Sequence, residues 1–102
     1  MEREEIYKLF VDTFGEDIQY TFAIEEMSEL IYAITKYKRK LATGTKEEVA
    51  KCKNNVIEEI ADVLNTAESL RFMFGKKEVE KIREEKLKRG IKRCKQKNLD
   101  VK

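Results

Sequence analysis

The chain contains no histidine and no proline, and only four of its 102 residues are glycine. Without histidine, a serine or cysteine triad, a histidine-ligated zinc site and a Glu-x-x-His di-iron bundle are all excluded. The scattered glycines form no phosphate-binding loop, so any phosphate must be held by metal ions or by Lys and Arg. Because proline breaks helices, its absence favours long helices throughout.

Cysteines and long apolar runs are also scarce. The two cysteines, Cys52 and Cys94, lie far apart without metal-like spacing, so we expect free thiols rather than a disulfide framework. No stretch approaches the roughly 20 apolar residues that span a membrane. The opening run MEREEIYKLF lacks the apolar core of a signal peptide. We therefore expect a cytoplasmic protein that does not bind a membrane.

Charge is abundant but unevenly distributed. Residues 76–102 carry 12 Lys or Arg against 5 Asp or Glu, whereas residues 1–75 carry 10 against 15. An acidic body can bind a metal ion and a basic C-terminal segment can bind an anion. A lysine-rich solvated helix gives the same pattern, so charge alone does not decide between these interpretations.

Apolar residues recur with helical spacing, and no segment alternates like a strand. We expect an all-α protein in which residues 1–102 form a single domain. Gly15 and Gly75 are expected to end helices, Asp17 to cap one, and Thr45 with Glu48 to form a capping box. The expected helices cover about residues 2–14, 17–41, 46–74 and the basic segment 77–97.

The second and third helices are joined by a short loop, so they must form an antiparallel hairpin. Such a hairpin leaves much apolar surface uncovered, and we therefore expect self-association. The expected core stripes are Met27, Leu30, Ile31 and Ile34 on the second helix, and Val49, Val56, Ile60, Leu64 and Ala67 on the third.

Both long helices carry a pair of acidic residues one turn apart, Glu26 with Glu29 and Glu59 with Asp62. We measure directions around each helix axis from Met27 on the second helix and from Ile60 on the third, at about 100° per residue. Glu26 and Glu59 then both point at about 260°, and Glu29 and Asp62 both point at about 200°. Both pairs therefore leave their helices at the same angle, so in an antiparallel hairpin they can converge.

Four converging carboxylates repel one another unless a cation lies among them. Hard oxygen ligands favour Mg²⁺, with Mn²⁺ as a possible substitute, and Mg²⁺ leaves positions for water and phosphate. A Ca²⁺-binding structural bundle is disfavoured because no glycine-turned calcium loop is present. The alternative is that these acids are surface residues partnered by lysines.

Several neighbours on the same helix faces predict a lined pocket for substrate. Phe22 and Tyr37 supply aromatic rings and Asn55 an amide. Ordinary packing of the two rings and a surface position for the amide remain open alternatives.

The phrase EExxE, followed about thirty residues later by EExxD, resembles the signature of the MazG-like all-alpha nucleoside triphosphate pyrophosphohydrolases. The resemblance covers roughly residues 20–93. The run from Asn55 to Val63 and the basic residues Lys86 to Arg89 are similar to the small, single-domain, phage-type members.

The resemblance implies a MazG-like bundle of about four helices that assembles as a homodimer or a dimer of dimers. It implies hydrolysis of a nucleoside triphosphate, canonical, deoxy or non-canonical, to the monophosphate and pyrophosphate. It also implies a Mg²⁺ site formed by Glu26, Glu29, Glu59 and Asp62.

Charge then assigns further roles within that reaction. Glu29 is our choice for the base that takes the proton of the attacking water, although sequence does not separate ligand from base. Lys36, Lys86 and Arg89 are candidates to neutralise the leaving pyrophosphate, with solvated basic side chains as the alternative.

The competing hypothesis is a non-catalytic helical interaction module, or a nucleic-acid-associated protein that uses the basic C-terminal segment. That segment lacks interleaved aromatic residues and the rest of the chain is acidic, so nucleic acid is not the expected partner. A binding module also has no need for two acidic pairs in matching phase.

Overall fold

The computed structural model describes residues 1–101, and the side chains of residues 1–99. Within these residues every regular element is a helix and no strand occurs, so the prediction of an all-α protein with four helices is confirmed. None of the four combines the length and the apolar character that crossing a membrane requires, as judged over the described residues. The helices are α1 (Arg3–Phe14), α2 (Glu16–Thr43), α3 (Lys46–Phe74) and α4 (Lys76–Val101).

The chain divides into two compact units. The first, Met1–Phe72, contains α1, α2 and nearly all of α3, and the second begins at Met73 and contains α4. The prediction of a single domain over residues 1–102 stays a prediction. The carboxylate pairs belong to the first unit, so its helices determine the geometry of the candidate site.

Single glycines join consecutive helices at two points. Gly15, between α1 and α2, has φ 87°, and Gly75, between α3 and α4, has φ 124°. Residues with a Cβ are strained at such angles, which explains why both helices end where glycine occurs. The prediction that Asp17 caps α2 is wrong, because α2 begins at Glu16 with Gly15 as its N-cap. Asp17 lies in the first turn, where the helix dipole stabilises its charge.

The α2–α3 turn is held by the expected capping box. The Glu48 backbone N–H donates to Thr45 Oγ1 at 3.2 Å, and the Thr45 N–H donates to Glu48 Oε1 at 3.1 Å. Glu48 also receives a hydrogen bond from Lys40 Nζ of α2 at 2.6 Å. The turn is therefore fixed both by the cap of α3 and by an ion pair between the two helices.

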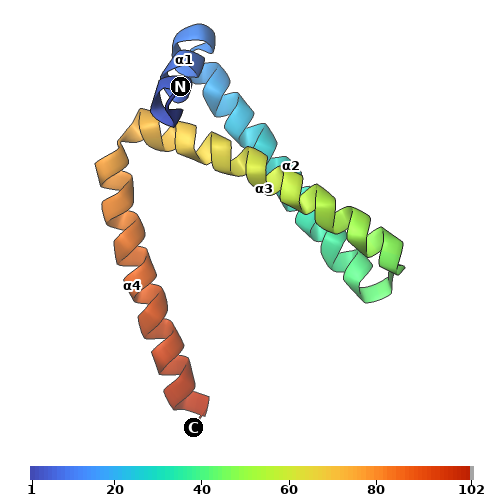
Figure 1. The fold of residues 1–102 in the computed structure, drawn as a ribbon. Coiled ribbons are helices and arrows are strands. Elements are labelled where there is room, and N and C mark those ends of the chain that lie inside the picture. Colours follow the sequence, from blue (N-terminus) through green and yellow to red (C-terminus); the bar gives the residue numbers. More distant parts are fainter. Residues whose placement is uncertain (102) are drawn as a thin grey trace. The chain divides into compact units, whose positions relative to one another are not determined.

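Figure 1 shows α2 and α3 lying against each other along most of their length and running in opposite directions. Buried and half-buried side chains recur along both helices at intervals of three and four residues, which is the spacing of a coiled-coil seam. We call these positions the seam. They are Gln19, Ala23, Glu26, Leu30, Ala33, Tyr37 and Lys40 on α2, and Val49, Cys52, Val56, Glu59, Val63, Thr66 and Leu70 on α3.

The predicted core stripes are partly wrong. Leu30, Val49 and Val56 lie in the seam, but the other large members of the stripes do not. Exposure of these other members ranges from 37% at Met27 to 67% at Ile31. The physical reason is that small seam residues such as Ala23 and Ala33 let the helices approach closely, which leaves the larger side chains at the edge. The incorrectly placed residues are Met27, Ile31 and Ile34 on α2, and Ile60 and Leu64 on α3.

The seam separates two faces of the hairpin. A step of one residue turns a helix by about 100°, and in antiparallel helices the residues following seam positions turn toward the same side. That side is exposed and apolar, and we call it the apolar face: Ile24, Met27, Ile31 and Ile34 of α2 with Ile57, Ile60 and Leu64 of α3.

Residues preceding seam positions turn toward the opposite side, which we call the polar face. It carries the remaining acids of the two pairs, Glu29 and Asp62, together with other polar groups and two exposed aromatic rings. The members are Phe22, Glu25, Glu29, Tyr32 and Lys36 of α2, and Lys51, Asn55, Glu58, Asp62, Asn65 and Ser69 of α3. The hairpin thus presents acids on one side and branched apolar side chains on the other.

Candidate functional site

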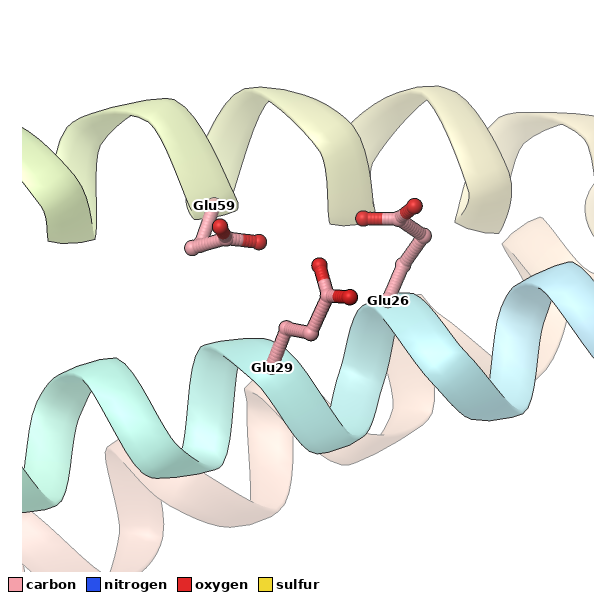
Figure 2. Close-up of side chains that lie close together, drawn as sticks. All are labelled: Glu26, Glu29 and Glu59. Atoms are coloured by element: carbon pink, nitrogen blue, oxygen red, sulfur yellow. The ribbon is translucent and has the colours of Figure 1, made fainter.

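Three glutamates meet between the two long helices. Glu26 and Glu29 extend from α2 toward α3, and Glu59 extends from α3 toward α2 (Figure 2). One carboxylate oxygen of each lies within 4.8 Å of one oxygen of each of the others. The predicted convergence of the two acidic pairs is therefore present for these three residues.

Asp62 stands outside this group of three but beside Glu26. The two carboxyl groups are in hydrogen-bonding position, and the charge of Asp62 acts on both Glu26 and Glu59. Glu59 lies similarly close to Glu29, so each seam glutamate is matched with a polar-face acid of the other helix. All four predicted ligands thus belong to one electrostatic cluster.

A constant register produces this matching. The cross-helix pairs involve four residues of α2, which are Gln19, Glu26, Glu29 and Lys40. Their partners on α3 follow in reverse order along the chain and with the same spacing between them. Regular antiparallel packing therefore brings the acids together without an irregular loop. The pairs in order are Gln19–Ser69, Glu26–Asp62, Glu29–Glu59 and Lys40–Glu48.

The two seam glutamates are the electrostatically strained members. Burial raises the pKa of Glu26, and the negative charges of Glu29, Asp62 and Glu59 raise it further. Burial likewise raises the pKa of Glu59, followed by the charges of Glu29 and Asp62. The Oε2 atom of each is buried and has no hydrogen-bond partner among the described residues. Each glutamate therefore holds an acceptor that the protein itself leaves unsatisfied.

A divalent cation fits these groups. Buried oxygens without donors gain from a positive charge, and closely spaced carboxylates lose their mutual repulsion when one is bound. Carboxylate oxygens are the ligands that Mg²⁺, Mn²⁺ and Ca²⁺ prefer. Acidic groups at a surface also occur without any ion, so the two orphan acceptors are the observation that distinguishes this cluster.

A hollow of about 320 Å³ opens on one side of the carboxylates, toward α1. We call it the aromatic hollow, because Phe10, Phe14 and Phe22 form part of its wall. Glu26 and Asp62 belong to the same wall, so the hollow reaches the acidic cluster directly. Its other lining residues are Gln19, Asn65, Thr66 and Ser69.

A second hollow, of about 500 Å³, lies toward the α2–α3 turn. We call it the basic hollow, because Lys36, Lys40 and Lys51 contribute to its lining. The amides of Asn54 and Asn55 and the side chains of Glu48, Cys52 and Glu58 complete it. The acidic cluster is thus flanked along the hairpin by an aromatic hollow and a basic one.

The predicted substrate-binding residues fall into three places. Phe22 lines the aromatic hollow, whereas Lys36 and Asn55 line the basic hollow. Tyr37 is a half-buried seam residue and lines neither hollow, which favours the packing alternative for it. Their roles toward a substrate stay predictions.

Lys86 and Arg89 belong to the second unit. On α4 they line, together with Arg93, a separate hollow of about 220 Å³. The three cations lie three and four residues apart, so one face of the helix presents them together. Contact of Lys86 or Arg89 with a pyrophosphate group stays a prediction.

Sequence reasoning missed most of the aromatic hollow. Phe10 and Phe14 were not among the expected pocket residues, and both are more than 40% exposed. Gln19 and Ser69 received no role, although they are buried polar residues. A usable signal existed, because Gln19 continues the three-and-four spacing of Ala23 and Glu26, and a polar residue in a seam requires a partner.

Comparisons of the chain with protein-family models, with curated proteins and with solved structures find no match.

Proposed function

We propose that the chain is a Mg²⁺-dependent nucleoside triphosphate pyrophosphohydrolase. The observation that carries this proposal is the pairing of Glu26 with Asp62 and of Glu59 with Glu29 across the seam. In each pair a buried, unsatisfied oxygen of the seam glutamate adjoins the cluster. Buried carboxylate oxygens without donors lower the stability of a purely structural hairpin. In a metal-binding hairpin the same oxygens serve as ligands.

Glu26, Glu29, Glu59 and Asp62 would hold the ion in this function. When bound, Mg²⁺ supplies positive charge to the phosphates and lowers the pKa of a bound water. The residues of the chain then have distinct tasks. The seam glutamates fix the position of the site, because their side chains are held between the helices, and the exposed Glu29 and Asp62 face the substrate side.

Glu29 accepts the proton of the attacking water in this mechanism. The water oxygen bonds to the α-phosphorus, the bond from that phosphorus to the α–β bridging oxygen breaks, and pyrophosphate leaves with the bonding electrons. Lys36, which lines the adjoining basic hollow, would stabilise the negative charge of the leaving group. Lys86 and Arg89 are assigned the same task on the strength of the resemblance.

The products test the reaction. With Mg²⁺ and a panel of ribo-, deoxy- and modified nucleoside triphosphates, chromatography should show monophosphate and pyrophosphate appearing together. A diphosphate should be a poorer substrate, because it lacks one of the gripped phosphates. Lys86→Ala or Arg89→Ala should lower triphosphate turnover more than diphosphate turnover, with Lys88→Ala as the matched control. Stepwise release of orthophosphate through a diphosphate would contradict the proposal.

We also propose that a second copy of the chain covers the apolar face, giving a homodimer or a dimer of dimers with a MazG-like fold. Seven branched or long apolar side chains lie on this face at regular helical intervals. A twofold axis through the face would pack these side chains of one copy against the same side chains of the other. Large exposed apolar patches on a monomer are unusual and mark contact surfaces. Such an assembly leaves the polar face and both hollows open to substrate, and the cytoplasm supplies both nucleotide and Mg²⁺.

A non-catalytic interaction module is the second candidate. One observation favours it, because residues 86–97 contain seven Lys or Arg and no acidic residue. Such a segment binds phosphates non-specifically, with an affinity that falls steeply as salt rises. The module predicts tight binding to a labelled oligonucleotide at low salt and no Mg²⁺-dependent hydrolysis, which is the reverse of the result expected for the enzyme.

A further inference from the structure

The aromatic hollow differs chemically from the basic hollow on the other side of the acidic cluster. Lys and Arg are absent from the lining residues described for the aromatic hollow, and aromatic residues are absent from those described for the basic hollow. A nucleotide has the same asymmetry, with a flat base at one end and a polyanion at the other. The assignment below rests on the proposed function.

The walls of the aromatic hollow suit a flat ring. Phe14 of α1 and Phe22 of α2 meet edge to face, with ring centroids 6.3 Å apart and planes at 69°. Both rings are about half exposed, and Phe10 is 41% exposed beside them. Aromatic rings that pack against each other and still face an opening are typical platforms for base stacking. A base in the hollow would cover apolar surface that the protein leaves exposed.

The floor of the hollow carries a buried amide. Gln19 is only 7% exposed and Ser69 only 4%, and the Ser69 hydroxyl donates to Gln19 Oε1 at 3.4 Å. Among the described residues, no group accepts a hydrogen bond from the Gln19 side-chain nitrogen. This nitrogen is not one of the buried atoms that lack a partner, so solvent reaches it and it can donate to a polar ligand in the hollow.

Amides recognise bases because they present a donor and an acceptor side by side, as the edges of nucleobases do. Asn65, at the exposed rim of the same hollow, adds a second amide. A ring held between phenylalanines and read along its edge by amides is the usual arrangement for an unstacked base. The volume of about 320 Å³ lies at the lower end of the range for small-molecule sites.

We propose that the aromatic hollow holds the nucleobase, that Gln19 reads its edge, and that the phosphates extend past the carboxylates toward the basic hollow. The nucleotide then lies along the hairpin, with its base toward α1 and its outer phosphates toward Lys36 and Lys51. This orientation brings the α-phosphate next to Glu26 and Asp62, which line the same hollow as the base. The reverse orientation would place the polyanion among phenylalanines and acids.

Nucleotide binding can be mapped without catalysis. Two-dimensional ¹⁵N NMR of the full chain would be recorded with each nucleoside 5′-monophosphate, and with ribose 5-phosphate as the ligand that lacks a base. The expected result is that the side-chain amides of Gln19 and Asn65 and the backbone amides of Phe14 and Ser69 shift with at least one nucleotide and not with ribose 5-phosphate. Identical shifts with ribose 5-phosphate, or no shift at these residues, would overturn the assignment.

Gln19→Met tests the reading of the base, because methionine keeps the length of the buried side chain but removes the amide. The ratio of kcat/KM between the best and the poorest base should fall by about tenfold, as expected for loss of one edge contact. Binding of inorganic tripolyphosphate should not change, which also shows that the variant is folded. A wild-type protein that binds nucleotides in the hollow but hydrolyses none would refute the enzyme and support this assignment. An unaltered base preference in an active Gln19→Met variant would refute the assignment alone.

Discussion

The two faces of the α2–α3 hairpin come from the same two helices but differ in charge and in polarity. The polar face adjoins a cluster of carboxylates whose mutual repulsion opposes folding, and the apolar face exposes side chains that would stabilise the protein only if something covered them. Neither face reaches its lowest free energy in an isolated chain. This contrast agrees with our two proposals, that a cation binds the acidic cluster and that a second copy of the chain covers the apolar face.

The strongest test of the acidic cluster is Glu59→Gln, which keeps the shape of the side chain and removes its charge. Loss of one metal ligand should lower kcat/KM by about 100-fold or more. Glu25→Gln, which changes a polar-face acid outside the two cross-helix pairs, should keep most of the activity.

The same substitution should not lower the stability of the metal-free protein, although it lowers the activity. A carboxyl group whose pKa is raised by folding favours the folded state below its ordinary pKa of 4.5, and this contribution is lost as pH rises through the raised pKa. At pH 7 without metal, the Glu59 charge therefore opposes folding, and Glu59→Gln should leave the melting temperature unchanged or higher. A marked fall in melting temperature without metal would show that Glu59 is structural.

The apolar face is tested by Ile31→Glu. Ile31 is 67% exposed in the single chain, so the substitution should change the stability of an isolated subunit by only about 0.5 kcal/mol. In a twofold assembly it removes two buried side chains and adds two charges, which should weaken association by about 100-fold or more. Analytical ultracentrifugation at micromolar concentration measures the shift toward a monomer of 12.1 kDa.

Tyr32→Glu is the matched control for that experiment. Tyr32 follows Ile31 in sequence and is 63% exposed, but it belongs to the polar face. Its substitution should leave the assembly intact. A wild-type protein that sediments only as a monomer would contradict the assignment of the apolar face.

Much of the fold could be predicted because local signals determine it. Gly15, Gly75 and the Thr45–Glu48 capping box set helix ends within the chain itself, without help from tertiary contacts. The seam could not be read in the same way. The most hydrophobic stripe of each helix was taken as its core, whereas small residues such as Ala23 and Ala33 allow the closest helix approach.

Of the candidate site, the convergence of the acids could be predicted from the sequence, but the aromatic hollow could not. The matching phase of Glu26 and Glu59 depends only on helical periodicity, so their convergence followed from the sequence pattern. The aromatic hollow depends on how α1 packs beside α2, and no local rule fixes the place of Phe10 or Phe14. Gln19 was visible in the sequence only as one polar residue among many.

The smallest expected effect distinguishes two kinds of carboxylate on the hairpin. Glu48, at the turn, has a pKa lowered to about 2 by the hydrogen bond from Lys40 and then by the backbone hydrogen bond from Thr45. A lowered pKa means that its charge supports folding above the ordinary value of 4.5, and that this support is lost as pH falls toward 2. Glu26 and Glu59 behave oppositely, because protonation relieves their repulsion.

The metal-free protein should therefore gain stability from its seam glutamates as pH falls from 7, and lose stability from Glu48 below about 4.5. Glu48→Gln should flatten that acid loss, whereas Glu47→Gln, in the same first turn of α3, should leave it in place. The effect will be small, because the Lys40–Glu48 pair is partly exposed to solvent. NMR titration of the side-chain carboxyl carbons measures both groups in one experiment. If Glu48 titrated near 4.5, the turn would not be held by its charge, and if Glu59 also did, the strain attributed to the cluster would be absent.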